Sequence, residues 1–210
     1  MKSTFFKYLV LSITLIVLTE LTKHFLHFDK FLYNSLAEKL TSKQIENYFE
    51  MQSKWKWLGY VFVPIFVLVK TLIIASAVYT AVFFFNKNKI SFKSILNIVL
   101  KAEFIFLLVP ILKIIWFYFF QTNYTLEDIQ YFYPLSALNI IGYAGLEPWL
   151  IYPLQILNLF ELAYIIYLAY QIGKVTSTNT DTGFKIMMYS YVPTLLLWVC
   201  VVMFLTLSMS

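Results

Sequence analysis

Residues 147–164 read EPWLIYPLQILNLFELAY. This stretch decides the fold, because it begins like a membrane interface and then carries polar residues into an apolar helix. Trp149 suits the level of the lipid headgroups, and a helix that enters there places Glu161 about 18 Å deeper, near mid-membrane. Asn158 lies three residues before Glu161 and shares its side of the helix. We expect that side to face other helices, because a carboxylate exposed to lipid is costly.

The composition of the chain is that of a polytopic membrane protein. Hydrophobic residues make up 60%, aromatic residues 20% and charged residues only 13%, which fits a membrane bundle far better than a soluble domain. All 16 basic residues are lysines, spread along the chain, so the arginine fork that recognises phosphate or guanine is missing. Nucleic acid is therefore not expected as a partner. The net charge of +5 is attributed to membrane topology and lipid headgroups.

Five apolar segments are each long enough to cross about 30 Å of hydrocarbon. We therefore predict an all-α fold, with a single membrane domain over residues 1–210 in which five transmembrane helices form a bundle. Pro64, Pro110 and Pro193 lie inside predicted spans and predict kinks, since neighbouring helices can satisfy the carbonyls that a proline frees. The predicted spans are residues 5–23, 58–85, 95–120, 149–172 and 184–208.

Lysine bias in the short loops predicts the orientation. The loops after the second and fourth spans carry lysines, whereas the loop after the third span has only acidic charges. We therefore expect the N-terminus in the cytoplasm and the C-terminus outside. The first loop disagrees, because its lysines would face outward, although acidic residues are interspersed among them. The lysines behind this prediction are Lys87, Lys89, Lys93, Lys174 and Lys185, and the acidic residues of the third loop are Glu127, Asp128 and Glu147.

Two connecting segments have a pattern of their own. Within residues 28–56, apolar residues recur at helical spacing up to Leu40, and Thr41-Ser42-Lys43-Gln44 forms a capping box that starts a second helix. We expect two short interfacial helices that either sense lipid, dock a partner or simply lie in the headgroups as a cap. Residues 131–146 are apolar but interrupted by one proline and two glycines, so they should lie along the outer interface or dip partly inward.

Signatures of soluble enzymes are missing from the sequence. It has no Gly-rich phosphate loop, no G-x-S-x-G, no HExxH and no cysteine pair, so we predict a non-enzymatic protein without a cofactor. One metal-like spacing exists, because Glu20, His24 and His27 at i, i+4 and i+7 would line one helix face and offer a two-His-one-carboxylate set. The simpler interpretation is that these residues lie at a helix end among the headgroups.

Charged residues inside the predicted spans are the main candidates for function. Counting about 1.5 Å per residue along helices of alternating direction brings Lys70, Glu103 and Glu161 to one depth, where they could meet beside Asn158. One interpretation is structural, with Lys70 as a counter-ion that ties three spans together. The other is a proton or cation relay, because intramembrane ionisable groups commonly mark transport pathways.

Three stretches of sequence carry a resemblance to a known family. They are LTSKQIENYFEMQSKWKWLG at 40–59, NKNKISFKSILNIVLKA at 86–102 and NLFELAYIIYLAYQIGKVTS at 158–177, the last followed by a final span that contains a proline. Together they resemble the bacterial form of the Yip (Ypt-interacting-protein) family. The resemblance implies five spans and a cytoplasmic N-terminus, and in eukaryotic members it implies Rab-linked vesicle trafficking and membrane shaping. The chain has almost no N-terminal extension and no DLYGP-type motif, so Rab binding is not carried over.

The sequence therefore predicts a non-enzymatic, Yip-like protein of the bacterial inner membrane that organises membrane lipids or partner membrane proteins. The alternative is a small transporter or channel subunit that uses Lys70, Glu103 and Glu161. An intramembrane enzyme is a third class, because a catalytic site needs only a few residues with tuned pKa values. A water-filled path to the charges would favour transport, a dry closed cluster a structural role, and a lipid-sized pocket lipid handling.

Overall fold

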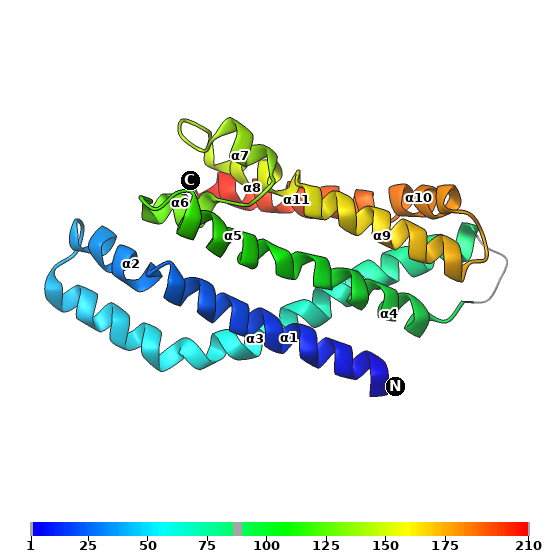
Figure 1. Ribbon diagram of the computed structural model, residues 1–210, viewed down its shortest axis with the longest axis horizontal. Helices are drawn as coiled ribbons and strands as arrows, with labels where there is room; N and C mark the ends of the chain where they lie inside the picture. The colour runs from blue at the N-terminus through cyan, green and yellow to red at the C-terminus, as the bar shows by residue number, and fades with distance from the viewer. Residues whose placement is uncertain (1, 86–89, 210) are drawn as a thin grey trace.

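The protein is a bundle of helices that run roughly along its long axis, with the two termini at opposite ends (Figure 1). The computed structural model describes residues 2–85 and 90–209, and within these two ranges no strand occurs apart from a single bridge between Ser136 and Asn158. Three helical stretches are long and apolar enough to cross a membrane, and these are Thr4–Phe25, Ser42–Phe85 and Thr180–Ser208. The all-α membrane fold predicted from the sequence is confirmed at this level.

The N-terminal third forms three helices, α1 (Lys2–Phe25), α2 (Phe28–Ala37) and α3 (Ser42–Phe85). The start of α3 shows the Gln44 half of the predicted capping box, since the backbone N–H of Thr41 donates to Gln44 Oε1 at 2.9 Å, and the Thr41 hydroxyl donates to the same oxygen at 2.9 Å. The expected second interfacial helix is not separate, however. It continues into the predicted second span as one helix of 44 residues, because the sequence between Gln44 and Pro64 offers only Gly59 as a helix breaker.

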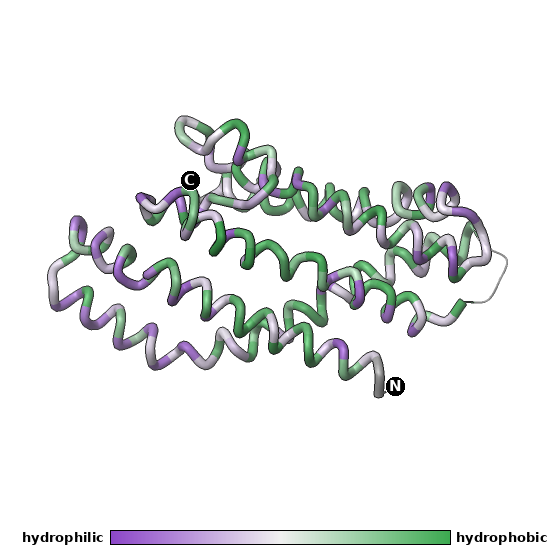
Figure 2. The backbone as a smooth tube through the Cα atoms, viewed as in Figure 1, coloured by the Kyte–Doolittle hydropathy of each residue, from purple (hydrophilic) through white to green (hydrophobic). Residues whose placement is uncertain are grey.

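The helices α2 and α3 form a hairpin at one end of the molecule. In Figure 2 the hydrophilic residues of α2 and of the start of α3 gather at the left end, beyond the more apolar middle. Phe28 and Phe31 of α2 pack against a buried cluster made by Leu26, Phe117 and Ile129. The apolar face of α2 therefore turns toward the bundle.

Residues 92–119 form three successive helices in place of the continuous span expected over 95–120. These are α4 (Phe92–Ala102), the 3₁₀ helix η1 (Glu103–Leu107) and α5 (Leu108–Phe119). Pro110 accounts for the interruption, because it has no N–H to donate to the carbonyl of Phe106 and its ring clashes with that carbonyl. The predicted kink takes the form of a 3₁₀ segment that begins at Glu103.

The span expected over residues 149–172 is also interrupted. Helix α8 (Pro148–Ile156) ends, and α9 (Leu159–Val175) begins after two non-helical residues. The preceding segment contains α6 (Leu126–Tyr131) and α7 (Ala137–Ile141). It returns to the break, where the N–H of Ala137 donates to the carbonyl of Leu157 at 2.8 Å and the N–H of Leu159 donates to the carbonyl of Leu135 at 3.2 Å. The segment thus packs against the broken helix.

The C-terminal part contains α10 (Thr180–Tyr189) and α11 (Tyr191–Met209), separated at Ser190. Pro193 cannot donate to the carbonyl of Tyr189, four residues earlier, and this explains the interruption. In contrast, α3 remains helical through Pro64. Of the three predicted proline kinks, those at Pro110 and Pro193 therefore correspond to interruptions of the helix.

The main core lies where α3, α4, α9 and α10 pack together. The residues that α3 and α4 bury follow the i, i+3, i+4, i+7 pattern of an amphipathic helix. On α3 they include Thr71, Ile74, Ala75 and Val78, and on α4 they include Ile95, Ile98, Val99 and Ala102, with Leu100 buried in addition. Helix α10 approaches α9 closely at Gly183, where a Cβ would lie 1.9 Å from the carbonyl oxygen of Ala169.

Replacing Gly183 by alanine should therefore lower the free energy of unfolding by about 1–3 kcal/mol or more, because two backbones must separate to admit a methyl group. Gly59 is the matched control, since it is also helical and no atom lies within 4 Å of the Cβ it would gain. Gly59→Ala should stabilise the helix by about 0.5–1 kcal/mol. Thermal unfolding in detergent micelles measures both effects, and equal midpoints for the two variants would contradict the close approach.

Candidate functional site

An ion pair between α3 and η1 lies at the centre of the candidate site. Lys70 Nζ lies 2.7 Å from Glu103 Oε2. The Glu103 side chain is 8% exposed, whereas that of Lys70 is 48% exposed. The ammonium also lies 4.4 Å from the centre of the Phe106 ring, a favourable position over an aromatic face. The structure thus brings together two of the three charged residues singled out from the sequence.

The other oxygen of Glu103 is bonded to Tyr164 of α9. The Tyr164 hydroxyl donates to Glu103 Oε1 at 3.0 Å, and Tyr164 is fully buried. Both carboxylate oxygens of Glu103 therefore have a partner on another helix. Sequence reasoning did not identify Tyr164, although it lies three residues after Glu161 and so on the same side of the helix.

Glu161 does not join the ion pair. Its Oε1 accepts a hydrogen bond from the hydroxyl of Tyr191 on α11, and the rings of Tyr164 and Tyr191 pack at 5.2 Å between centroids. The expected meeting of three charges is thus replaced by two hydrogen-bonded groups joined through aromatic rings. Tyr191 could not be singled out from sequence, because it lies at the start of an apolar helix with no charged residue three or four positions away.

Asn158 caps α9. Its Oδ1 accepts from the backbone N–H of Glu161 at 2.7 Å, and its Nδ2 donates to the carbonyls of Gln155 and Ile156 at 2.8 and 3.0 Å. Glu161 therefore stands in the first turn of α9, where the helix dipole favours a negative charge. The prediction that both residues lie on one face of a continuous helix is wrong, because α8 ends at Ile156 and α9 begins only after Asn158.

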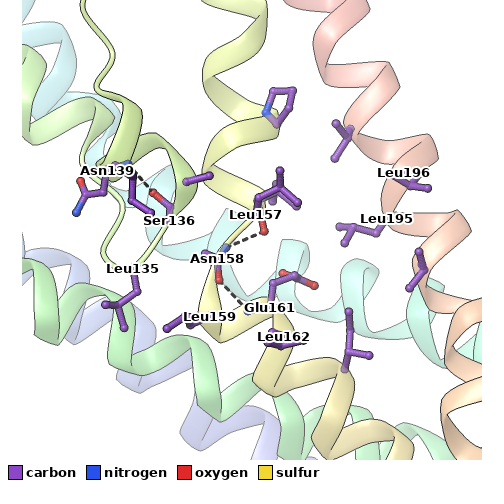
Figure 3. A pocket seen from close by; sticks show the side chains of 17 residues that line it. Leu135, Ser136, Asn139, Leu157, Asn158, Leu159, Glu161, Leu162, Leu195 and Leu196 are labelled. Carbon is purple, nitrogen blue, oxygen red and sulfur yellow. Dashed lines mark hydrogen bonds between the residues drawn. The ribbon is translucent and has the colours of Figure 1, made fainter.

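A cavity of about 850 Å³ opens beside this break. It is lined by residues of α7, α8, α9 and α11 together with the turn before α7. Figure 3 shows Asn158 and Glu161 at the start of α9, with Leu195 and Leu196 of α11 opposite them. The wall is mostly leucine, isoleucine and valine, and its polar members are Ser136, Asn139, Asn158 and Glu161. The cavity is thus an apolar groove with a carboxyl group in its wall.

The metal-like set on α1 is not assembled. Among the residues that the structure describes, no three His, Cys, Asp or Glu side chains lie close enough to hold a metal ion. Helix α1 ends at Phe25 and His27 adopts a left-handed backbone with φ 47°, so the i, i+7 relation that would align it with Glu20 is lost. Glu20 instead pairs with Lys56 of α3 at 2.9 Å.

Comparisons with known proteins assign no function to this chain, so the geometry of the candidate site is the evidence for one. No family model matches the chain, and no curated protein or solved structure matches it either. The resemblance to the Yip family therefore stays a prediction from the residues.

Replacing Lys70 by methionine should lower the free energy of unfolding by about 1–3 kcal/mol, because the buried Glu103 loses a charged donor. The double variant Lys70→Met/Glu103→Gln should recover most of this loss, since an amide oxygen can still accept from Tyr164 and needs no counter-ion. Unfolding of the wild type, both single variants and the double variant in detergent gives the coupling energy.

Lys174→Met is the control for this cycle. Lys174 is an exposed lysine in the last turn of α9, and its replacement should change the free energy of unfolding by no more than about 0.5 kcal/mol. If Lys70→Met destabilised the protein no more than Lys174→Met, the ion pair would not contribute to the stability of the fold.

Proposed function

We propose that this protein is a non-enzymatic integral membrane protein that binds membrane lipid in the groove between α7, α8, α9 and α11. The groove carries this proposal. Its volume of about 850 Å³ lies within the range of about 300–1,000 Å³ that small-molecule sites occupy. Its apolar wall suits an acyl chain, and Leu157 and Leu196 at its edge are 65% and 58% exposed. An opening with such an apolar rim favours entry from the membrane rather than from water.

Five membrane crossings form part of the proposal. The interrupted segments 92–119 and 148–175 pack against helices that can span a membrane, since α4 contacts α3 and α9 contacts α10. Irregular backbone at membrane depth is tolerated where it is buried in protein or lines a cavity, and the α8–α9 break lines the groove. An odd number of crossings also agrees with termini at opposite ends of the bundle (Figure 1).

The proposal also includes the orientation of the protein in the membrane and its cellular location. Lysine bias places the N-terminus in the cytoplasm of a bacterial inner membrane, although Lys87 and Lys89 lie outside the described residues. The Yip-like resemblance supports the same topology. Lipids are then the principal partners, and the α2–α3 hairpin is the surface proposed for other membrane proteins.

A small transporter or channel is the second candidate function, and the interrupted helices favour it. Transporters often bind their substrates where broken helices meet near mid-membrane, and here Glu103 and Glu161 both lie at such interruptions. Both oxygens of Glu103 are, however, bonded to Lys70 and Tyr164. Neither oxygen of Glu103 is therefore free for a transported ion, and we rank lipid binding above ion transport.

Lipid retention by two neighbouring tryptophan variants tests the groove. Leu196 lines the cavity, whereas the adjacent Leu197 is similarly exposed and does not. Leu196→Trp should weaken lipid binding at least fivefold, since a clash of about 1 kcal/mol has that effect, and Leu197→Trp should leave it unchanged. Native mass spectrometry of protein released from nanodiscs counts the retained lipid, and equal retention by both variants would exclude the groove as the site.

Cysteine labelling tests the proposed orientation. With the lone Cys200 replaced by serine, a cysteine at Glu127 should react with an impermeant maleimide on intact cells, and a cysteine at Asp181 should react only after lysis. Both positions are exposed, on α6 and α10 respectively. The opposite pattern would invert the orientation, and labelling of both on intact cells would contradict an odd number of crossings between them.

A further inference from the structure

The wall of the groove contains a carboxyl oxygen for which the described residues supply no donor. Glu161 is 8% exposed and lines the cavity, and its Oε1 is taken by the Tyr191 hydroxyl. Within residues 2–85 and 90–209, no hydrogen bond or ion pair reaches its other carboxyl oxygen, Oε2. Because Glu161 lines the groove, this oxygen can accept a hydrogen bond from a donor that enters the groove.

Of the other polar residues of the wall, Asn158 and Ser136 are already satisfied, and Asn139 is exposed. Asn158 uses its amide oxygen and nitrogen on the backbone around the helix break. The Ser136 hydroxyl donates to the carbonyl of Tyr133 at 2.7 Å and accepts from the N–H of Asn139 at 3.3 Å. Glu161 is therefore the group that would select a headgroup at this end of the groove.

The charge of the wall limits which headgroup fits. No lysine or histidine is among the lining residues that the structure describes, and Lys70 is held by Glu103. A phosphate or carboxylate headgroup would thus meet Glu161 without a compensating cation, which is unfavourable in an apolar site. An ammonium would have to lose its water, and the attraction of a buried pair often only offsets that loss.

A hydroxyl meets neither difficulty. It donates a hydrogen bond to a carboxylate oxygen, which an ether of the same size cannot do, and it brings no charge into the groove. We propose that the occupant is a membrane lipid with a small hydroxyl headgroup, such as a long-chain alcohol or a diacylglycerol, with its hydroxyl bonded to Glu161 Oε2 and its chain along the leucines of α9 and α11. This inference rests on the proposed lipid-binding function and names its ligand class.

Photoreactive probes with one hexadecyl chain and different headgroups test the assignment. The wild-type protein in phosphatidylcholine nanodiscs is irradiated with an alcohol, its methyl ether, the carboxylic acid or the primary amine, each carrying a diazirine on the chain. The alcohol should label residues of the groove about tenfold more than the methyl ether and the acid, because one hydrogen bond is worth roughly a factor of ten. Peptide mapping locates the label.

The outcomes separate the two proposals. Equal labelling by alcohol and ether, or preferential labelling by acid or amine, would overturn the hydroxyl assignment and leave the groove as a lipid site. Absence of groove labelling by every probe would overturn the lipid-binding function itself. Glu161→Leu should make alcohol and ether equivalent, and the comparison of headgroups on the wild type stands even if that variant does not fold.

Discussion

A helix that stops inside an apolar bundle must still pair its free backbone groups, and the break between α8 and α9 depends on how this is done. Asn158 caps the first turn of α9, while residues 135 and 137 supply a carbonyl and an N–H to the broken backbone. Leu135 adopts φ 57° to do so, a conformation that a leucine rarely takes. The turn before α7, the groove and the position of Glu161 all follow from this one requirement.

Much of the fold was predictable because apolar periodicity and length are local properties. The sequence located the helical segments and two of the proline interruptions, yet it overestimated the number of unbroken spans. Asn158 and Glu161 illustrate the reason. Their spacing is that of a capping box, a signal for a helix start, but in an apolar stretch it also describes two polar residues on one helix face. Only the hydrogen bonds of the break to Leu135 and Ala137 decide between these interpretations, and those residues lie about 20 positions earlier in the chain.

The candidate site was predictable to the same limited degree. Depth counting along helices paired Lys70 with Glu103, because α3 and α4 are regular up to that level. It failed for Glu161, because the break before α9 changes the register of every later residue. Tyr164 and Tyr191 carry the hydrogen bonds that connect these elements, and tyrosines are too common in this chain, with 16 of them, for sequence alone to single out two.

The length of α3 has a mechanical consequence. Its 44 residues rise about 66 Å, roughly twice the hydrocarbon thickness of a bilayer, and Pro64 stands close to its midpoint. Proline removes one backbone hydrogen bond there, and the Tyr8 hydroxyl of α1 holds the Pro64 carbonyl at 2.9 Å. Pro64 is therefore the point at which α3 can bend most easily, and its carbonyl is held by α1. A tilt of about 10° at Pro64 would move the polar tip of the helix by about 6 Å, while Lys70 stays within two turns of that point.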